Sequence, residues 1–100
     1  MSADMTLSEL QASLSQEAPP SGVPELVRAL WHDARGDWDR AHRMAQSVDD
    51  AEGAWVHAYL HRKEGDPANA EYWYSRAGKR RPDVSLDEEW EEIARALLAE

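Results

Sequence analysis

VRALWHDARGDWDRA, residues 27–41, recurs as VHAYLHRKEGDPANA at residues 56–70. Both segments follow the pattern V-x-A-x-x-H-x-x-x-G-D-x-x-x-A, and they lie 29 residues apart. An internal repeat of this length indicates a unit of supersecondary structure that stacks on a copy of itself. The repeat is therefore the first guide to the fold.

Each copy predicts a helix, a tight turn and a second helix. Glycine after an apolar segment supplies the left-handed residue that ends a helix, and Gly36 and Gly65 occupy this position. The aspartates that follow, Asp37 and Asp66, are suited to cap the next helix. Pro67 then fits the first turn of that helix, where its missing N–H costs nothing. Two stacked helical hairpins follow from this pattern.

Capping-box pairs mark three more helix starts, because an oxygen at the N-cap and a carboxylate three residues later satisfy free N–H groups. These pairs are Thr6 with Glu9, Asp49 with Glu52, and Ser85 with Glu88. We expect an all-α fold with helices near 7–16, 24–35, 38–47, 50–64, 67–78 and 86–99. Residues 1–22 form an N-terminal helix and a Pro-rich joint, and residues 23–100 form the repeat domain with a C-terminal capping helix.

The two terminal helices are amphipathic. Leu7, Leu10 and Leu14 form a narrow stripe that docks on the repeats or on a second copy of the chain, and the sequence leaves both alternatives open. In the last helix, apolar residues lie on one side while most acids face away, which predicts a cap on the second hairpin. The apolar side consists of Leu86, Trp90, Ile93, Leu97 and Leu98.

Composition excludes several classes of protein. The 100 residues contain no cysteine, which excludes disulfides and thiolate metal sites. The net charge is −9 and the only basic cluster, residues 79–81, precedes an acidic helix, so we expect no nucleic-acid partner. No run of about 18 apolar residues and no secretory signal is seen, so we expect a cytoplasmic protein without a membrane partner.

The second copy, GAWVHAYLHRKEGDPANAEYWYSRAGKRRP, resembles the tetratricopeptide-repeat consensus. The matching positions are Ala58, Gly65, Asp66, Ala70, Tyr74, Ala77 and Pro82. The first copy keeps Ala29, Gly36, Asp37, Trp38 and Ala41, but the 29-residue spacing is shorter than the usual 34 or so. The resemblance covers about residues 24 to 82 and implies antiparallel helix pairs that bind a protein or peptide. ALWHDARGDWDRAH and GAWVHAYLHRKEGD also look like segments of small uncharacterised bacterial proteins.

The resemblance implies a concave face lined by the first helix of each pair. Its predicted positions are Leu26, Leu30, Asp33, Trp55, Tyr59, Arg62 and Lys63. Two aromatic rings beside two cations suit an acidic or amphipathic peptide segment, and we expect these residues to bind the partner. The alternative is that Trp55 and Tyr59 pack against the neighbouring copy or the N-terminal helix.

The histidines suggest a second function, metal or small-ligand binding. His57 and His61 lie four residues apart on one helix face, and Glu64 follows three residues later, so the three side chains can reach one ion. His32 is the repeat equivalent of His61. The competing interpretation is that these are hydrogen-bonded interior histidines, which predicts destabilisation by acid.

Catalytic motifs are lacking. The sequence has no Gly-rich phosphate loop, no nucleophile elbow and no cysteine nucleophile. An acid–base role for His32 with Asp33 or His42 has only the residue types in its favour. We therefore expect a protein that is not an enzyme and that needs no cofactor, with metal binding at His57, His61 and Glu64 as the alternative to peptide binding.

Overall fold

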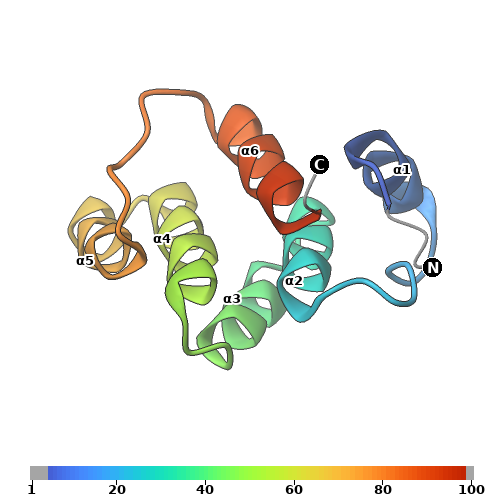
Figure 1. The fold of residues 1–100 in the computed structure, drawn as a ribbon, viewed down its shortest axis with the longest axis horizontal. Helices are drawn as coiled ribbons and strands as arrows, with labels where there is room; N and C mark the ends of the chain where they lie inside the picture. Colours follow the sequence, from blue (N-terminus) through green and yellow to red (C-terminus); the bar gives the residue numbers. More distant parts are fainter. Residues whose placement is uncertain (1–4, 99–100) are drawn as a thin grey trace.

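The protein is described by a computed structural model that covers residues 5–98, and the regular structure within this range is entirely helical (Figure 1). The elements are α1 (Leu7–Ala12), η1 (Ser13–Ser15, a 3₁₀-helix), α2 (Glu25–Ala34), α3 (Trp38–Gln46), α4 (Ala51–Glu64), α5 (Pro67–Ala77) and α6 (Leu86–Leu98). The predicted all-α fold of packed helix pairs is confirmed. Only the first helix differs clearly from its prediction, since the α-helix ends at Ala12 and continues as the 3₁₀-turn.

The two copies of the sequence repeat form two hairpins, α2 with α3 and α4 with α5. At both turns the glycine has a positive φ, 88° at Gly36 and 86° at Gly65. At both turns the following aspartate is the N-cap of the next helix, and its carboxylate accepts a hydrogen bond from the backbone N–H three residues later. In both hairpins, a glycine with positive φ followed by a capping aspartate therefore reverses the direction of the chain.

The start of α4 corrects one predicted cap. The sequence pairs Asp49 with Glu52, but the N-cap is Asp50, whose carboxylate accepts a hydrogen bond from the Gly53 N–H at 2.8 Å. The two adjacent aspartates are chemically equivalent, and the second is the cap in a connection so close that a Cβ at Gly53 would clash with the Val48 carbonyl oxygen. The predicted boxes at Thr6 and Ser85 are both formed.

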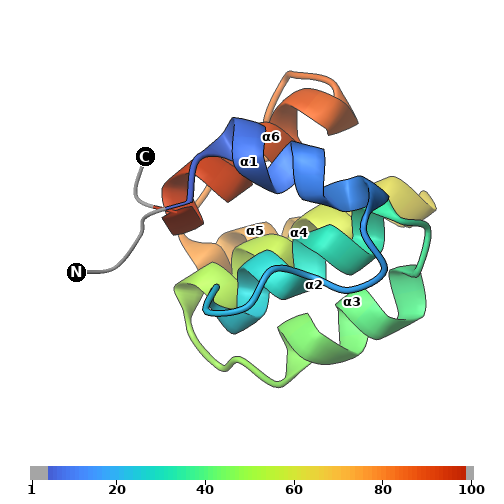
Figure 2. The same ribbon diagram turned by 90° about the vertical axis from the view of Figure 1, so that its right-hand side faces the viewer.

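The helices form two layers. Helices α2 to α5 lie side by side in chain order, and α6 crosses over α2 and α4 with α1 next to it (Figures 1 and 2). One apolar core joins the layers and includes Leu10 of α1, Leu30 of α2, Leu60 of α4 and Ile93 of α6, each with no exposed surface. α6 thus covers both hairpins rather than capping only the second.

The leucine stripe of α1 belongs to this core. Leu7 and Leu10 are buried, and Leu14 packs against them from the 3₁₀-turn. Of the two predicted roles, docking on the repeats is the one that the structure shows. The Pro-rich joint lies between the N-terminal helix and the repeats in the sequence, but α1 packs in the same core as the repeats. Within the described residues, none of the helices has the length and apolar character that a bilayer span requires.

Candidate functional site

The face formed by α2 and α4 carries the seven residues predicted to bind a partner, and α6 lies on it. Four of the seven, Leu26, Leu30, Asp33 and Tyr59, are buried, each at most 4% exposed. Trp55 and Arg62 are partly buried, and Lys63 is exposed. The sequence predicted an open concave surface, whereas the structure shows an internal boundary between the two layers.

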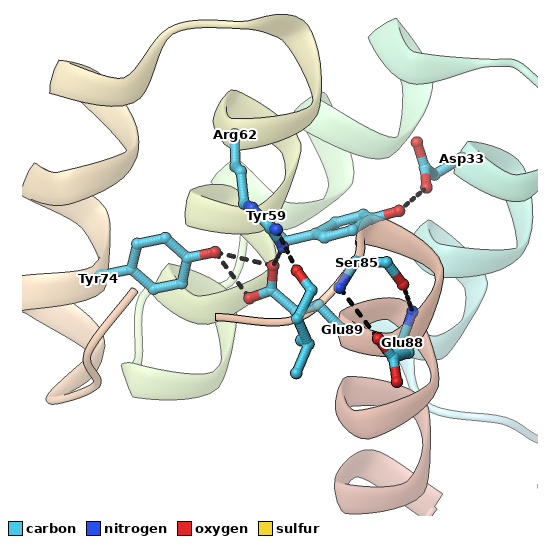
Figure 3. A network of polar contacts seen from close by, with 8 residues as sticks. Asp33, Tyr59, Arg62, Tyr74, Ser85, Glu88 and Glu89 are labelled. Atoms are coloured by element: carbon cyan, nitrogen blue, oxygen red, sulfur yellow. Dashed lines mark hydrogen bonds and ion pairs between the residues drawn. The ribbon is translucent and has the colours of Figure 1, made fainter. Parts of the chain in front are cut away.

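Asp33 is the polar centre of the α2 side of this face. Its carboxylate is 1% exposed and accepts a hydrogen bond from the Tyr59 hydroxyl at 3.0 Å (Figure 3). It also accepts one from the Lys63 ammonium at 2.9 Å. Burial, and then the adjacent Asp33 charge, raise the pKa of Tyr59, so the phenol stays protonated and remains a donor. The three side chains satisfy one another within the chain.

Glu89 is the polar centre of the α6 side. Its carboxylate has no exposed surface and accepts hydrogen bonds from the Tyr74 hydroxyl at 2.7 and 2.9 Å and from Arg62 at 2.8 Å (Figure 3). Arg62 also donates to the backbone carbonyl of Val84. Burial raises the pKa of Tyr74. The sequence predicted that most acids of the last helix face away from the core, and Glu89 is an exception because it faces the first layer and is fully buried.

Of the two predicted cations, Arg62 holds α6 in place, whereas Lys63 binds Asp33 of α2. Arg62 binds Glu89, and the indole N–H of Trp90 donates to the backbone carbonyl of Leu30 at 3.0 Å. Trp55 lies beneath the Lys79 ammonium, which is 4.1 Å from the ring centroid. α6 leaves a pocket of about 310 Å³ on this face, which Asp33, Tyr59 and Lys63 line together with Trp90 of α6. The alternative that Tyr59 is a packing residue matches its contacts.

The other side of α4, which faces α3 and α5, carries a cluster of three histidines. His57 and His61 project from α4, and His42 meets them from α3. One ring nitrogen from each histidine lies within 4.8 Å of the other two. The Nε2 atoms of His42 and His57 are 2.8 Å apart, a hydrogen bond in which one ring donates and the other accepts. The predicted pair His57 and His61 is thus brought together.

Two tryptophans flank the cluster. The Trp38 ring stacks on His42 with centroids 4.8 Å apart, and the Trp73 ring stacks on His57 at 3.9 Å. The Trp38 indole N–H donates to the backbone carbonyl of Leu60 at 2.8 Å, which holds this ring against α4. The two indoles restrict the rotation of the imidazoles and exclude water from their faces.

Glu64 has a different place from the one predicted. Its carboxylate is 2.7 Å from Nδ1 of His61, so it accepts a hydrogen bond from that N–H and leaves Nε2 of His61 for the cluster. A second group, His61 with Glu64 and Asp66, also meets the 4.8 Å limit. In that group the Asp66 carboxylate already caps α5. Glu64 is therefore an orienting partner of His61, and the third imidazole comes from His42.

The remaining histidine lies apart from the cluster. His32 packs with its ring against the edge of Trp31, at 5.1 Å between centroids. His42 lies on α3, and the sequence interpretation considered it only as an acid–base partner of His32. The available signal was the pair Trp38 and His42, which are four residues apart on one face of α3. Only the packing of α3 against α4 places that face opposite His57.

Two imidazoles of the cluster, those of His57 and His42, have a lowered pKa. Burial, and then the neighbouring His42 and His61, together lower the pKa of His57 to about 4. Burial also lowers the pKa of His42. A neutral imidazole offers a lone pair, which a protonated ring does not, so these rings can act as metal ligands at neutral pH.

Comparison of the chain with protein-family models, with curated proteins and with solved structures finds no match. The class of protein is thus defined by the fold and the site alone. It is a small all-α protein in which two helical hairpins bring three histidines together.

Proposed function

We propose that the protein binds a divalent transition-metal ion through His42, His57 and His61. The observation that carries the proposal is the convergence of three imidazole nitrogens within 4.8 Å. Zinc–nitrogen bonds of about 2.0–2.1 Å in a tetrahedral site require nitrogens about 3.4 Å apart. The His42–His57 distance of 2.8 Å is shorter than this value, so the two rings must separate slightly when the ion binds.

The donor set narrows the choice of ion. Three neutral imidazoles suit Zn²⁺, Ni²⁺, Cu²⁺ and Co²⁺, whereas Mg²⁺ and Ca²⁺ prefer oxygen ligands. The Glu64 carboxylate at Nδ1 of His61 is the kind of outer partner that metal-bound histidines commonly have. We take Zn²⁺ as the ion, with three protein ligands and a fourth position open.

An ion in this position would link the two hairpins. His42 belongs to the first hairpin, while His57 and His61 belong to the second. Binding to the folded chain alone stabilises it by about 2.7 kcal/mol when free metal is at a hundredfold excess over the Kd. Metal binding therefore predicts a rise in melting temperature.

Peptide binding on the α2/α4 face, expected from the repeat resemblance, has less support. Lys63 and Tyr59 are bound to Asp33 of α2, and Arg62 is bound to Glu89 of α6, and both carboxylates are almost fully buried. Among the described residues, Glu64 is the acidic side chain that pairs with the histidine cluster, and no other does so. This difference favours the metal proposal over the peptide proposal.

Isothermal titration of the metal-free protein with Zn²⁺ tests the proposal. We expect one equivalent to bind, and we expect His57→Asn to abolish uptake because it removes one of three ligands. Glu64→Gln should weaken binding about 10- to 100-fold. His32→Asn is the matched control, since it removes a buried imidazole outside the cluster. A wild-type chain that takes up no Zn²⁺, or equal losses in the His57 and His32 variants, would contradict the proposal.

A further inference from the structure

A pocket of about 230 Å³ adjoins the histidine cluster. His57 belongs to both, since its ring lines the pocket and its Nε2 contacts His42. The other walls come from the end of α3, the connection to α4, the first turns of α4 and the face of α5 that carries Trp73 and Arg76. The pocket can hold a small organic molecule, since it is several times the roughly 30 Å³ that one water occupies.

Arg76 gives this pocket a directional donor. Its guanidinium lies 5.2 Å from the centroid of the Trp73 ring, and one of its nitrogens donates to the Tyr72 hydroxyl at 3.1 Å. Another nitrogen is 4.0 Å from the Asp49 carboxylate, which is longer than a hydrogen bond. Arg76 is about half exposed. The planar fork of a guanidinium matches two carboxylate oxygens.

The two acidic residues that line the pocket, Asp49 and Asp50, do not form a hydrogen-bonded ion pair with Arg76. The Asp50 carboxylate is committed to the N-terminus of α4 through the Gly53 N–H. The Asp49 side chain is 96% exposed and fully hydrated, so it competes weakly for Arg76. An anion that enters the pocket meets the only cation of the described lining, Arg76, together with the Trp73 ring as an apolar wall.

We infer that the pocket binds a small organic carboxylate, shared between Arg76 and the open coordination position of the metal. The inference rests on the proposed metal function, because three neutral imidazoles leave the charge of the ion uncompensated and its coordination incomplete. An oxygen anion supplies both the negative charge and the missing ligand. The Trp73 ring, which stacks on His57, provides a flat surface for the apolar part of the ligand.

The test uses the full chain loaded with Co²⁺, whose visible absorption spectrum reports its coordination. Benzoate is the probe, with acetate and inorganic phosphate as comparison ligands. We expect benzoate to change the Co²⁺ spectrum in a saturable way and to bind more tightly than acetate or phosphate. Arg76→Gln should weaken benzoate at least about tenfold, as expected for loss of a charged hydrogen-bonded pair, while Co²⁺ affinity stays the same.

Arg80→Gln is the matched control, because it removes the same charge from an exposed arginine outside the pocket. We expect it to leave benzoate affinity within twofold of the wild type. Failure to take up Co²⁺ would overturn the metal proposal itself. Uptake of Co²⁺ without a benzoate response, tighter binding of phosphate than benzoate, or equal effects of the two arginine variants would overturn the carboxylate inference alone.

Discussion

Replacing Glu89 by glutamine tests whether the second layer is held by its buried carboxylate. In the wild type this carboxylate accepts hydrogen bonds from Tyr74 and Arg62 and has no exposed surface. Glutamine keeps the shape of the side chain but removes its negative charge. Its NH₂ group is a donor, and it would face Arg62 or Tyr74, both of which donate to the carboxylate in the wild type. The variant therefore leaves the Arg62 guanidinium without its anionic partner.

The expected cost follows from the exposure of that guanidinium. Breaking a fully buried ion pair costs about 3–5 kcal/mol because the remaining charge is stranded. The Arg62 side chain is 22% exposed and still donates to the Val84 carbonyl, so its charge is partly solvated. We expect Glu89→Gln to lower the free energy of unfolding by about 2–3 kcal/mol, or the Tm by roughly 10–20 °C.

Urea denaturation followed by far-UV circular dichroism measures this change. Tyr74→Phe is the companion variant, since it removes one neutral donor to the same carboxylate and should cost about 1 kcal/mol. Arg62→Met should cost the most, because it leaves the Glu89 charge buried with one neutral partner. A loss below about 0.5 kcal/mol in Glu89→Gln, or a larger loss in Tyr74→Phe, would refute the assignment of Glu89 as the anchor.

Three further outcomes are expected. Because burial lowers the pKa of His57 to about 4, the unfolded chain takes up a proton there below about pH 6.5 that the folded chain refuses, so stability falls between these pH values by up to about 1.4 kcal/mol per unit. Urea melts of His57→Asn across this range should show a shallower loss. Gly65→Ala should lower the free energy of unfolding by about 1–2 kcal/mol in the same assay, because φ is 86°, a value that alanine rarely adopts. No atom crowds the new Cβ, so this cost comes from the backbone conformation alone. Gly53→Ala should also destabilise, although alanine normally favours a helix, because its Cβ would clash with the Val48 carbonyl oxygen; unchanged or raised stability would contradict this.

The helices were predictable because their ends are encoded locally. Gly36 and Gly65 end their helices by a backbone conformation that other residues rarely adopt, and the adjacent aspartates begin the next ones. Each of these signals lies within a few residues of its effect. The choice between Asp49 and Asp50 failed because it depends on how tightly α3 connects to α4, which a spacing rule does not contain.

The position of α6 was less predictable. Its apolar stripe, with Trp90 and Ile93, correctly indicates a helix that packs on one side. The stripe does not say which groove receives it, and it gives no reason to bury Glu89. That burial depends on Arg62 and Tyr74, which lie 27 and 15 residues away in the chain. Complementary charges at such separation are visible only once the helices are packed.

The histidine site was half predictable for a similar reason. The spacing of His57 and His61 on one helix is a local property, and it correctly places both rings on one face. His42 joins them from a different helix, and its contact depends on the register between α3 and α4. The sequence offered Glu64 as the third ligand because it is close in sequence, and the same closeness, three residues along α4, makes it the hydrogen-bond partner of His61.

The two sides of α4 differ in how their buried polar side chains are paired, and this difference supports the metal proposal. On the side of α6, each buried carboxylate accepts hydrogen bonds from two donor side chains of fixed protonation, so Asp33 and Glu89 have the partners that their burial requires. On the side of α3, His42 and His57 share a single hydrogen atom between two acceptor nitrogens, and burial opposes the proton that would supply another. A metal ion can replace this hydrogen bond, because it binds the lone pairs without protonating the rings. The side of α4 that carries the histidines also borders a pocket of about 230 Å³, which His57 lines.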